Sequence, residues 1–352
     1  MVKKMPDKPA PQSNHPIDAV IAWVDGSDPR LAAKRNLYLE EAKGTSQYGV
    51  QPTFFASSNE IRYCVLSILT FAPFVRNIFI VTDDQDPNLD EAIKTCFPGK
   101  ADTIRIVDHK EIFRGYEQYL PTFNSTSMES MIWRIEGLSE NFIYFNDDVF
   151  LIRDHQPEEW FKNNRPVLRG KWLLPPYRKM VGNHIKTIIN VYFRKNRDYR
   201  PKLSFYLRQW NAASLLGMKY RYFFHCHTPH AMSRIRLEKF FTENRALLEK
   251  NIANRFRNPD QYIMISLANH LEIMDGNRQI EKLNLGYLHP YYSKKRMERR
   301  MRRCKNDPGI KSICAQNLDM FGSEVREKIF GWMDQVLDLQ KRQSGMKEGT
   351  AL

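Results

Sequence analysis

The sequence predicts an α/β fold: a mostly parallel, Rossmann-like sheet with helical insertions and a helical C-terminal part. In the first half of the chain, short apolar runs typical of buried strands are separated by segments with helical apolar spacing. Strands connected through helices are expected to lie parallel in one sheet. The chain has 352 residues, 42% of them hydrophobic, which is enough for one large domain with insertions or for two smaller domains.

Four strands and one helix account for the first half of this prediction. The strands are expected at residues 17–24, 78–82, 103–107 and 142–145, and the helix at residues 61–71. The first two strands lead into the polar, turn-forming runs WVDGSDP and TDD. Because the carboxyl ends of parallel strands meet at one edge of a sheet, candidate site residues are expected along that edge.

The second half has a different pattern. Residues 156–224 are rich in Arg, Lys, Trp, Tyr and Pro without a clean period, which suggests an insertion that either covers the crevice or receives substrate. Amphipathic helices are expected at residues 235–250, 259–272 and 324–339. Their apolar faces are interpreted as ordinary core packing.

Composition and charge narrow the classes of partner. Lys and Arg exceed Asp and Glu, giving a formal net charge of +14, which favours a nucleotide phosphate, an anionic glycan, an anionic membrane face or nucleic acid. The odd number of cysteines favours a reducing compartment, although a bridge between Cys304 and Cys314 stays open. Residues 1–16 have no apolar stretch, so a disordered tail is expected there rather than a signal peptide or membrane span, and the end after Gln340 should be frayed.

Two carboxylates, Asp147 and Asp148, follow the predicted strand FIYFN directly. Adjacent carboxylates repel each other, and near a sheet they need a cation, a basic neighbour or water to neutralise them. A divalent metal explains the pair economically, because Mg²⁺ prefers carboxylate oxygens. A plain turn is the alternative, since Asn and Asp favour turns. The segment alone favours neither interpretation.

Three further segments could contact anions. Residues 225–230, HCHTPH, hold three histidines and a thiol, but no second ligand pair follows at zinc spacing, so a catalytic or phosphate-contacting role is favoured over structural zinc. Arg255 and Arg257 precede a predicted helix, and a helix N-terminus with adjacent arginine is a natural anion site. The run YYSKKRMERRMRR at residues 291–303 is either a solvated face or a site for phosphates or anionic lipid.

Long ordered motifs in the chain resemble the Stealth family. They are IDAVIAWVDGSDP, NEIRYCVLSILTFAPFVRNIFIVTDDQ, LPTFNSTSMESMIWRIEGLSENFIYFNDDVF, HTPHAMSR and FRNPD, with a weaker match at ICAQNLD. They cover residues 17–151 and 225–270, whereas residues 156–224 show no usable match. The family includes bacterial capsular polysaccharide phosphotransferases and the catalytic subunit of the lysosomal-enzyme N-acetylglucosamine-1-phosphotransferase.

The resemblance implies a reaction and a division of the chain. A hexose or N-acetylhexosamine 1-phosphate would pass from a UDP-sugar to a hydroxyl of a glycan acceptor, releasing UMP and forming a phosphodiester in capsular or exopolysaccharide synthesis. The fold would be of the nucleotide-sugar transferase type. Residues 17–155 would form the nucleotide-sugar and metal-binding core, residues 156–224 a variable insertion and candidate acceptor site, residues 225–320 the rest of the core, and residues 321–352 a C-terminal helix and tail.

The resemblance also implies catalytic roles. Asp147 and Asp148 would bind Mg²⁺ or Mn²⁺ directly or through water, and Arg257 would contact the phosphates. His227 would accept the proton of the acceptor hydroxyl, since the reference pKa of histidine lies near neutrality. Alternatively, Asp148 is the base and His227 positions phosphate.

Six other residues are implied in substrate binding. The nucleotide pocket would be shaped by Trp23, Asp25, Gly26 and Arg62 of the first two motifs, with Gly26 letting backbone approach the ligand closely. Contacts to sugar or acceptor would come from Asn124 and Glu129 of the LPTFNSTSMES run.

The substrates and the cellular location of the protein are expected from the same resemblance. A UDP-sugar donor and a glycan acceptor are expected in the bacterial cytoplasm, with peripheral association at the inner membrane face or with capsule-synthesis machinery. One alternative is a metal-dependent UDP-sugar glycosyltransferase that forms a glycosidic bond and releases UDP. Another is a basic nucleic-acid-binding protein, which the charge alone suggests; no nucleic acid is expected, because no reader motif is recognisable.

Overall fold

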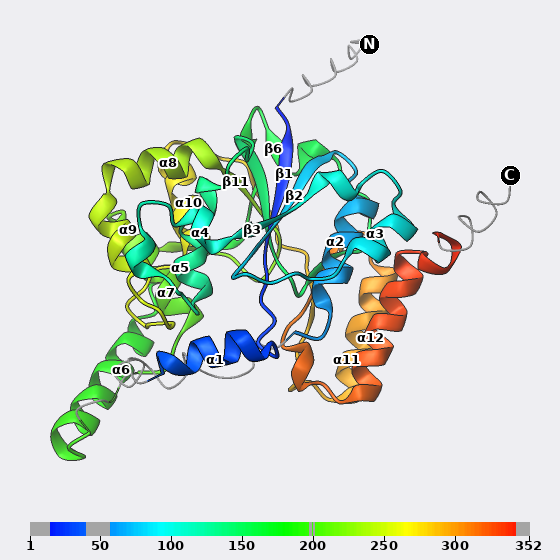
Figure 1. Cartoon of the computed structure of the whole chain (residues 1–352). Helices are drawn as coiled ribbons and strands as arrows, with labels where there is room; N and C mark the ends of the chain where they lie inside the picture. Colours follow the sequence, from blue (N-terminus) through cyan, green and yellow to red (C-terminus); the bar gives the residue numbers. More distant parts are fainter. Residues whose placement is uncertain (1–14, 40–56, 197–198, 200, 343–352) are drawn as a thin grey trace, which may run out of the picture.

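A five-stranded sheet forms the centre of the computed structural model, which describes residues 15–39, 57–196, 199 and 201–342 (Figure 1). Its strand order is β11-β4-β1-β2-β3. The first four strands along the chain are parallel to their neighbours, and β11 pairs antiparallel with β4. The predicted α/β class with a mostly parallel sheet is confirmed. The strands are β1 (Ile17–Ala22), β2 (Val75–Thr82), β3 (Ile104–Asp108), β4 (Asn141–Asn146) and β11 (His230–Ser233).

The order of the sheet reverses between β1 and β4. From β1 the chain adds β2 and then β3 on one side, and it returns to the other side of β1 with β4. In open α/β sheets the crevice outside the carboxyl ends of the strands at such a reversal is the usual place for a ligand. The register pairs Ala22 with Asn146, so Trp23 and Asp147 leave the sheet at the same edge.

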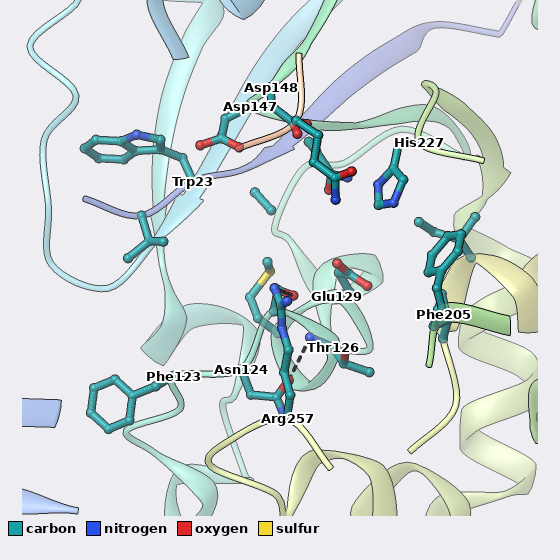
Figure 2. Close-up of a pocket in the computed structure, with 18 of the residues that line it drawn as sticks. Trp23, Phe123, Asn124, Thr126, Glu129, Asp147, Asp148, Phe205, His227 and Arg257 are labelled. Carbon is teal, nitrogen blue, oxygen red and sulfur yellow. Dashed lines mark hydrogen bonds between the residues drawn. The ribbon is translucent and has the colours of Figure 1, made fainter. Parts of the chain in front are cut away.

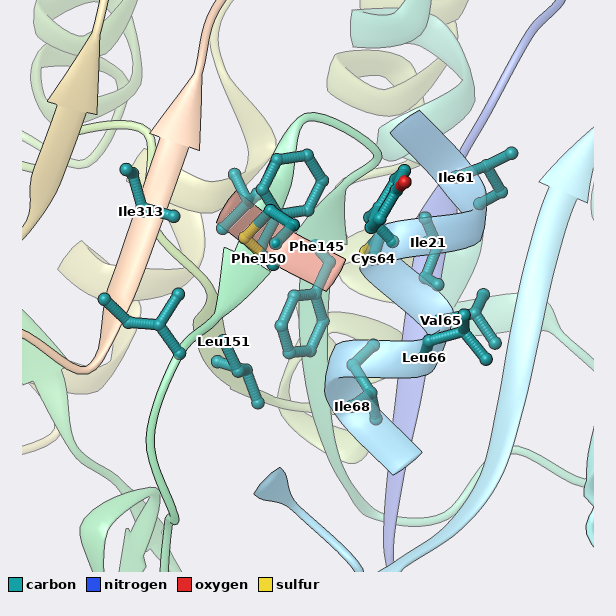
Figure 3. Close-up of a cluster of buried hydrophobic side chains, with 14 of the residues drawn as sticks. Ile21, Ile61, Cys64, Val65, Leu66, Ile68, Phe145, Phe150, Leu151 and Ile313 are labelled. Atoms are coloured by element: carbon teal, nitrogen blue, oxygen red, sulfur yellow. The ribbon is translucent and has the colours of Figure 1, made fainter. Parts of the chain in front are cut away.

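One face of the sheet is covered by α2 (Glu60–Phe71), α3 (Asp90–Cys96), α11 (Lys294–Asn306) and α12 (Ser323–Val336). Figure 3 shows Ile61, Val65 and Ile68 of α2 beside Ile21 and Phe145 of the sheet. All these side chains are buried. Their spacing in α2 matches the helical period, which explains why the sequence alone located this helix.

The opposite face is covered by helices that include α4 (His109–Ile112), α5 (Ser125–Glu129), α8 (Arg234–Glu243), α9 (Arg245–Ile252) and α10 (Met264–Met274). Alternate residues of a strand point to opposite faces. Val20 and Tyr144 accordingly pack in this layer, while Ile21 and Phe145 pack against α2. The strands are apolar on both faces, as expected for a sheet buried between two helical layers.

A small second sheet continues from β4 through the turn at Asp147 and Asp148. It has the order β13 (Gly286–Leu288), β14 (Ser312–Ala315) and β5 (Val149–Leu151). Gly286 lies against α11, where a Cβ atom would be 2.5 Å from the Cys304 sulfur, so the close approach requires glycine. The two acidic residues therefore connect two sheets that are each held by their own packing.

Two helix predictions were wrong in detail. The helix expected at residues 235–250 is broken into α8 and α9 at Asn244, whose backbone N–H and side-chain Nδ2 both donate to the Phe240 carbonyl and so end α8. The helix expected from residue 259 begins only at Met264, because side-chain hydrogen bonds such as that from the Asn258 N–H to Gln261 Oε1 hold the preceding residues in a loop. The helix expected at residues 324–339 is confirmed as α12.

The remaining segments are short or peripheral. Helix α1 (Pro29–Leu37) follows β1, and the described residues of 156–224 include very short strands, the helices α6 and α7, a 3-10 turn at Pro157–Glu159 and a π-helical turn at Ile189–Phe193. Helix α6 projects away from the rest of the molecule (Figure 1). The tails predicted at residues 1–16 and after Gln340 lie almost entirely outside the described residues. The elements of the insertion are β6 (Phe161–Lys162), β7 (Arg165–Pro166), β8 (Leu168–Arg169), β9 (Lys171–Leu173), α6 (Tyr177–Ile188), α7 (Phe205–Leu215) and β10 (Tyr222–Phe224), with β12 (Ile280–Glu281) pairing to β8.

None of the helices in the described part of the chain combines the length and the apolar character needed to cross a bilayer.

Candidate functional site

A cavity of about 250 Å³ opens at the carboxyl ends of β1 and β4 (Figure 2). It lies where the order of the sheet reverses. The predicted site residues that line it are Trp23, Asn124, Glu129, Asp147, Asp148, His227 and Arg257. Figure 2 shows Asp147 and Asp148 on one side and Arg257 on the other, with His227 and Phe205 along the edge between them.

One side of the cavity, which we call the acidic wall, consists of Glu60, Asp147, Asp148 and Asp319. Burial raises the pKa of the Asp147 carboxyl well above its usual value, and the nearby Glu60 and Asp148 raise it further. Burial raises the pKa of Asp148 to about 6. It also raises the pKa of Glu60, to which the charges of Asp148 and Asp319 contribute. The wall therefore concentrates negative charge in a place that disfavours it.

The turn that carries the two aspartates is fixed from both sides. The Ala315 N–H donates to the Asp148 carbonyl over 2.9 Å, and the Cys314 thiol lies 3.6 Å from Asp148 Oδ2. The Cys64 thiol approaches the Asn146 carbonyl at 3.8 Å. β14 and α2 thus hold the carboxylates in place.

The chemistry of the acidic wall fits a divalent cation that substrate helps to bind. In residues 15–39, 57–196, 199 and 201–342, no three His, Cys, Asp or Glu side chains gather into a ready-made metal cluster. Mg²⁺ is commonly held by one or two carboxylates together with waters and substrate phosphates. Asp148 Oδ1 is buried and has no hydrogen-bond partner among the described residues. An orphaned carboxylate oxygen next to a second carboxylate is a suitable donor set for that mode of binding.

The opposite side, which we call the basic wall, consists of Arg208, Arg257 and the carboxyl group of Glu129. Arg208 Nη1 donates to Thr126 Oγ1 over 2.7 Å, and Arg257 Nη2 donates to Ser125 Oγ over 2.8 Å. Burial lowers the pKa of Arg208 to about 10, which still lies above neutral pH, and it also lowers the pKa of Arg257. The basic wall keeps a net positive charge.

Glu129 is the internal counter-ion of the basic wall. Burial raises the pKa of its carboxyl, while Arg257, the Tyr144 hydroxyl and Arg208 lower it. The Tyr144 hydroxyl donates to Glu129 Oε1 over 3.1 Å, and it also lies 3.0 Å from Asn146 Oδ1. Tyr144 belongs to β4, the strand that leads into the acidic wall. Glu129 therefore balances the arginines, although a contact to sugar or acceptor was predicted for it.

Arg257 reaches the cavity from a loop and not from a helix N-terminus. The predicted helix start at residue 259 was wrong, because α10 begins at Met264. The loop is held instead by side chains: Asn258 N–H donates to Gln261 Oε1 over 2.9 Å, and Gln261 Nε2 donates to the Asn251 carbonyl over 2.7 Å. Arg257 therefore offers its guanidinium to an anion without support from a helix dipole.

His227 is stacked between aromatic rings at the edge of the cavity. Its ring centroid lies 4.8 Å from that of Phe205 and 6.5 Å from that of Tyr287. Burial lowers its pKa to about 4, and Arg257, Arg208 and His289 contribute. The pKa of this ring therefore lies below the reference value of histidine, because burial and neighbouring cations both disfavour its charged form. At neutral pH the ring is uncharged and can accept a proton.

The other residues of the HCHTPH run have structural contacts. The Cys226 carbonyl lies 3.2 Å from His225 Nδ1 and 3.1 Å from His230 Nε2. Both histidine rings are buried, and burial lowers their pKa values. All five cysteines fall in the described part of the chain and are free, so Cys304 and Cys314 do not pair. The run delivers His227 to the cavity without forming a zinc site.

Asn124 and Trp23 line the cavity but are held by the protein. Asn124 Oδ1 accepts from the Thr126 N–H over 3.1 Å and caps α5, while its Nδ2 donates to the Asn254 carbonyl and to Gln261. The hydrogen-bonding groups of Asn124 are therefore already engaged. Trp23 is nearly buried, and its indole Nε1 lies 3.4 Å from Ser57 Oγ. Its ring remains available for stacking.

Asp25, Gly26 and Arg62 are not among the residues that line the cavity. The Asp25 carboxylate accepts hydrogen bonds from the backbone and hydroxyl of Ser27, and so shapes the loop after β1. The Arg62 guanidinium lies 6.0 Å from the Tyr63 ring centroid. The predicted nucleotide-binding role of these three residues has no support from the cavity lining.

Four residues of the site carried no predicted role. Glu60 begins α2, Asp319 lies in the weakly matching ICAQNLD segment, and Phe205 and Arg208 lie on α7. Asp319 had a signal in the sequence, because an acidic residue ended a recognised motif. The α7 pair had none, since the motifs do not extend into residues 156–224. That segment supplies part of the cavity wall, and acceptor binding by it stays a prediction.

Comparison with known families locates two matches along the chain. Residues 15–42 match the model described as Stealth protein CR1, conserved region 1. Residues 54–168 match Stealth protein CR2, conserved region 2. The two matches include the predicted strands of the central sheet and the turn at Asp147 and Asp148.

Curated relatives extend the similarity. The receptor polysaccharide phosphotransferase WefC of Streptococcus oralis is 30% identical over 284 residues, 77% of this chain and 82% of that protein. A capsular polysaccharide phosphotransferase of Actinobacillus pleuropneumoniae is 43% identical over 150 residues, 42% of this chain and 39% of that protein. An exopolysaccharide phosphotransferase of Streptomyces coelicolor is 34% identical over 262 residues, 72% of this chain and 38% of that protein. The matches to the latter two span about two fifths of the relative's length.

Solved structures are only distantly similar. A galactosyltransferase crystallised with donor and acceptor sugar analogues aligns with a TM-score of 0.41 and 11% identity, covering 89% of this chain and 95% of that chain. The bifunctional glycosyltransferase WbbM aligns with a TM-score of 0.42 and 10% identity, covering 95% of this chain and 53% of that chain. Scores this low say nothing about the reaction.

Proposed function

The chain belongs to the Stealth family, and on that basis we propose that it transfers a sugar 1-phosphate from a UDP-sugar to a hydroxyl group of a glycan acceptor. Relatives named capsular, exopolysaccharide and receptor polysaccharide phosphotransferases support a transferase in polysaccharide synthesis. We assign the sugar a hexose or N-acetylhexosamine identity, and we place the reaction in the bacterial cytoplasm.

The observation that carries the proposal is the opposition of the two walls. A nucleotide diphosphate presents negative oxygens along a short chain, and it requires positive charge on each side of the phosphorus that is attacked. Arg208 and Arg257 supply positive charge from one side. The acidic wall would attract a cation to the other side. A cavity with both features is suited to a pyrophosphate.

We propose that Asp147 and Asp148 hold a divalent cation, Mg²⁺ or Mn²⁺. When bound there, the cation would offset the negative charge of the pyrophosphate oxygens. Glu60 and Asp319 lie on the same wall and would add to its attraction for the cation. The burial of the carboxylates supports this role, because partly desolvated acids bind a cation more strongly than exposed ones.

In the proposed reaction, the acceptor oxygen attacks the phosphorus that carries the sugar. The new bond joins the acceptor oxygen to that phosphorus, and the bond from this phosphorus to the bridging oxygen of UMP breaks. Arg257 and Arg208 bind the phosphoryl oxygens and hold them in line. His227 takes the proton of the acceptor hydroxyl, or Asp148 takes it while His227 positions phosphate. The phosphodiester and UMP are the products.

The arginines also adjust the proposed base. Their charges contribute to the low pKa of His227. A bound pyrophosphate would offset their charge, so the pKa of the ring should rise towards its ordinary value when substrate is present. His227 would then be a stronger proton acceptor in the substrate complex than in the free protein.

Product analysis tests the proposal. The purified protein is incubated with Mg²⁺, a panel of UDP-sugars and a glycan acceptor, and the products are analysed by nucleotide chromatography and phosphorus NMR. The proposal predicts UMP and a new phosphodiester signal. Release of UDP with a phosphate-free glycosidic product would instead identify a glycosyltransferase and would overturn the proposal. A protein without its Asp148 carboxylate is the control for contaminating activity.

A further inference from the structure

Helix α6 carries an apolar stripe on the surface of the molecule. Its side chains recur at intervals of three and four residues, which places them on one helical face. They are highly exposed, and none of the residues of α6 is buried. The stripe consists of Tyr177 (54% exposed), Val181 (58%), Ile185 (50%), Ile188 (37%) and, in the π-helical turn Ile189–Phe193 that follows, Tyr192 (75%).

Among the described residues, packing accounts for little of this stripe: the Tyr177 hydroxyl donates to the Lys219 carbonyl over 3.1 Å, while the apolar side chains stay exposed. Figure 1 shows α6 projecting from the body, away from the central sheet. Leu174 and Phe193 extend the apolar surface at its two ends, each with 79% of its surface exposed. A contiguous exposed apolar surface on a globular protein usually marks a place of contact with a protein or a membrane.

The charge around the stripe selects between these partners. Arg178 borders the stripe. Lys179 and Lys186, two helical turns apart, lie on the opposite side of the helix. The sequence contains no acidic residue between Glu159 and Asp198. In the described part of the chain, these three cations take part in no ion pair; Lys179 instead lies 4.2 Å from the Tyr206 ring centroid. The helix is therefore apolar on one face and basic on the other.

We propose that α6 is an interfacial anchor that lies in the headgroup region of an anionic lipid bilayer. An amphipathic helix with an apolar face bordered by Lys and Arg, and with aromatic residues on the apolar face, is typical of such anchors. A second copy of the chain fits less well, because pairing two stripes would bring basic flanks together without acids to neutralise them. An anionic bilayer neutralises the flanks and buries the stripe together.

The basic helix α11 does not have this property. The sequence alone had made residues 291–303 the candidate for anionic lipid. Met297 and Cys304 of α11 are buried against the core, and its exposed surface is built from charged residues. Tyr292 is covered by Arg296, whose guanidinium lies 3.9 Å from the ring centroid. α11 can attract anions, but it has no apolar face left to insert.

Flotation with vesicles tests the anchor. The full chain is mixed with vesicles of phosphatidylglycerol and phosphatidylcholine in equal parts, or of phosphatidylcholine alone. The proposal predicts at least about tenfold stronger binding to the anionic vesicles. The double variant Val181→Lys with Ile185→Lys should lose binding by at least about tenfold although it gains positive charge, because the apolar face is interrupted.

The matched control is on α11. The variant Lys295→Gln with Arg299→Gln removes two exposed cations from that helix and should change vesicle binding by less than about twofold. Circular dichroism should show both variants folded, since all four positions are exposed or partly exposed. Equal binding of the Val181→Lys and Ile185→Lys variant and the unmodified protein would overturn the proposal. So would a dimer in solution that this variant converts to a monomer, because the stripe would then bind a second copy.

Discussion

The two walls of the cavity are buried to a similar degree, yet they balance their charge in opposite ways. The basic wall contains its own counter-ion, Glu129, whose carboxyl is stabilised in its charged form by both Arg257 and Arg208. The acidic wall contains no cation among the described residues that line the cavity, and its carboxyls raise one another's pKa values. The basic wall has its counter-ion before a ligand arrives, whereas in our proposal the acidic wall is completed by a cation. That difference gives opposite expectations for changes on the two sides.

Removal of metal should have the largest effect. EDTA is expected to abolish sugar 1-phosphate transfer, and Mg²⁺ or Mn²⁺ to restore it, because the acidic wall alone repels the pyrophosphate. Mg²⁺ should also raise the unfolding temperature of the substrate-free protein by binding the folded state only. Nucleotide release and a thermal melt measure the two effects. Activity that is indifferent to chelation would remove the cation from the proposal.

The variant Asp148→Asn breaks the acidic wall. Turnover should fall by at least about a hundredfold, while the metal-free protein becomes more stable by about 1 kcal/mol, because a repelling buried charge is gone. Kinetics and denaturant unfolding without metal measure these changes. Asp154→Asn, at an exposed position beyond β5, is the matched control and should leave both unchanged. A loss of stability in Asp148→Asn would show that its charge is already compensated.

The variant Arg257→Ala breaks the basic wall, and its effect on stability should have the opposite sign. Turnover should again fall by at least about a hundredfold, but the protein should lose about 3 kcal/mol of stability, because Glu129 loses a buried partner. Adding Glu129→Gln should recover much of the stability and none of the activity. If the double variant is no more stable than Arg257→Ala, Glu129 is not the counter-ion of this wall.

The variant His227→Ala distinguishes the two candidate bases. If His227 accepts the proton, kcat should fall by at least about a hundredfold with little change in KM. If the ring only positions phosphate, the loss should appear mainly in KM. NMR titration should find the pKa of His227 near 4 in the free protein and higher in Arg257→Ala, where one of its neighbouring cations is gone. An unchanged pKa would show that the charge of Arg257 does not lower the pKa of His227.

Acid should act on stability through several buried histidines outside the walls. Burial lowers the pKa of both His155 and His270 to about 4, whereas histidine in an unfolded chain titrates near 6.5. Between these values the unfolded state binds protons that the folded state does not. The contribution of these histidines to stability should therefore fall as pH drops from about 6.5 to about 4, by up to roughly 1.4 kcal/mol per pH unit for each such group. Denaturant unfolding at several pH values measures the slope. The slope should decrease in His270→Gln, and an unchanged slope would contradict the assignment.

The fold was largely predictable because its strands are apolar on both faces. Residues 142–145 and 17–24 are continuous apolar runs, which predict buried strands, and the apolar residues of α2 are spaced along one helical face. The break at Asn244 and the late start of α10 were not predictable. They depend on side-chain hydrogen bonds, to Phe240 in the first case and among Asn258, Gln261 and Asn251 in the second.

The site was predictable where motifs end at the sheet edge. Asp147, Asp148, His227 and Arg257 meet in one cavity, and each had been singled out. Arg208 could not be found, because it reaches the cavity through the packing of α7 on α10 and no local pattern marks it. The charge balance was hidden for the same reason. Only the fold shows that Glu129 faces arginines while Asp148 faces other acids.

Tyr144 has a consequence for the selection of ligands. Its hydroxyl contacts Glu129 of the basic wall, and its strand continues through Asn146 into the aspartates of the acidic wall. One rigid β-strand therefore sets the gap between the walls, and no hinge intervenes. A gap of fixed width would favour ligands whose charged groups are spaced to engage both walls over ligands that are too short to do so. Discrimination by length would then be built into the scaffold before any sugar is recognised.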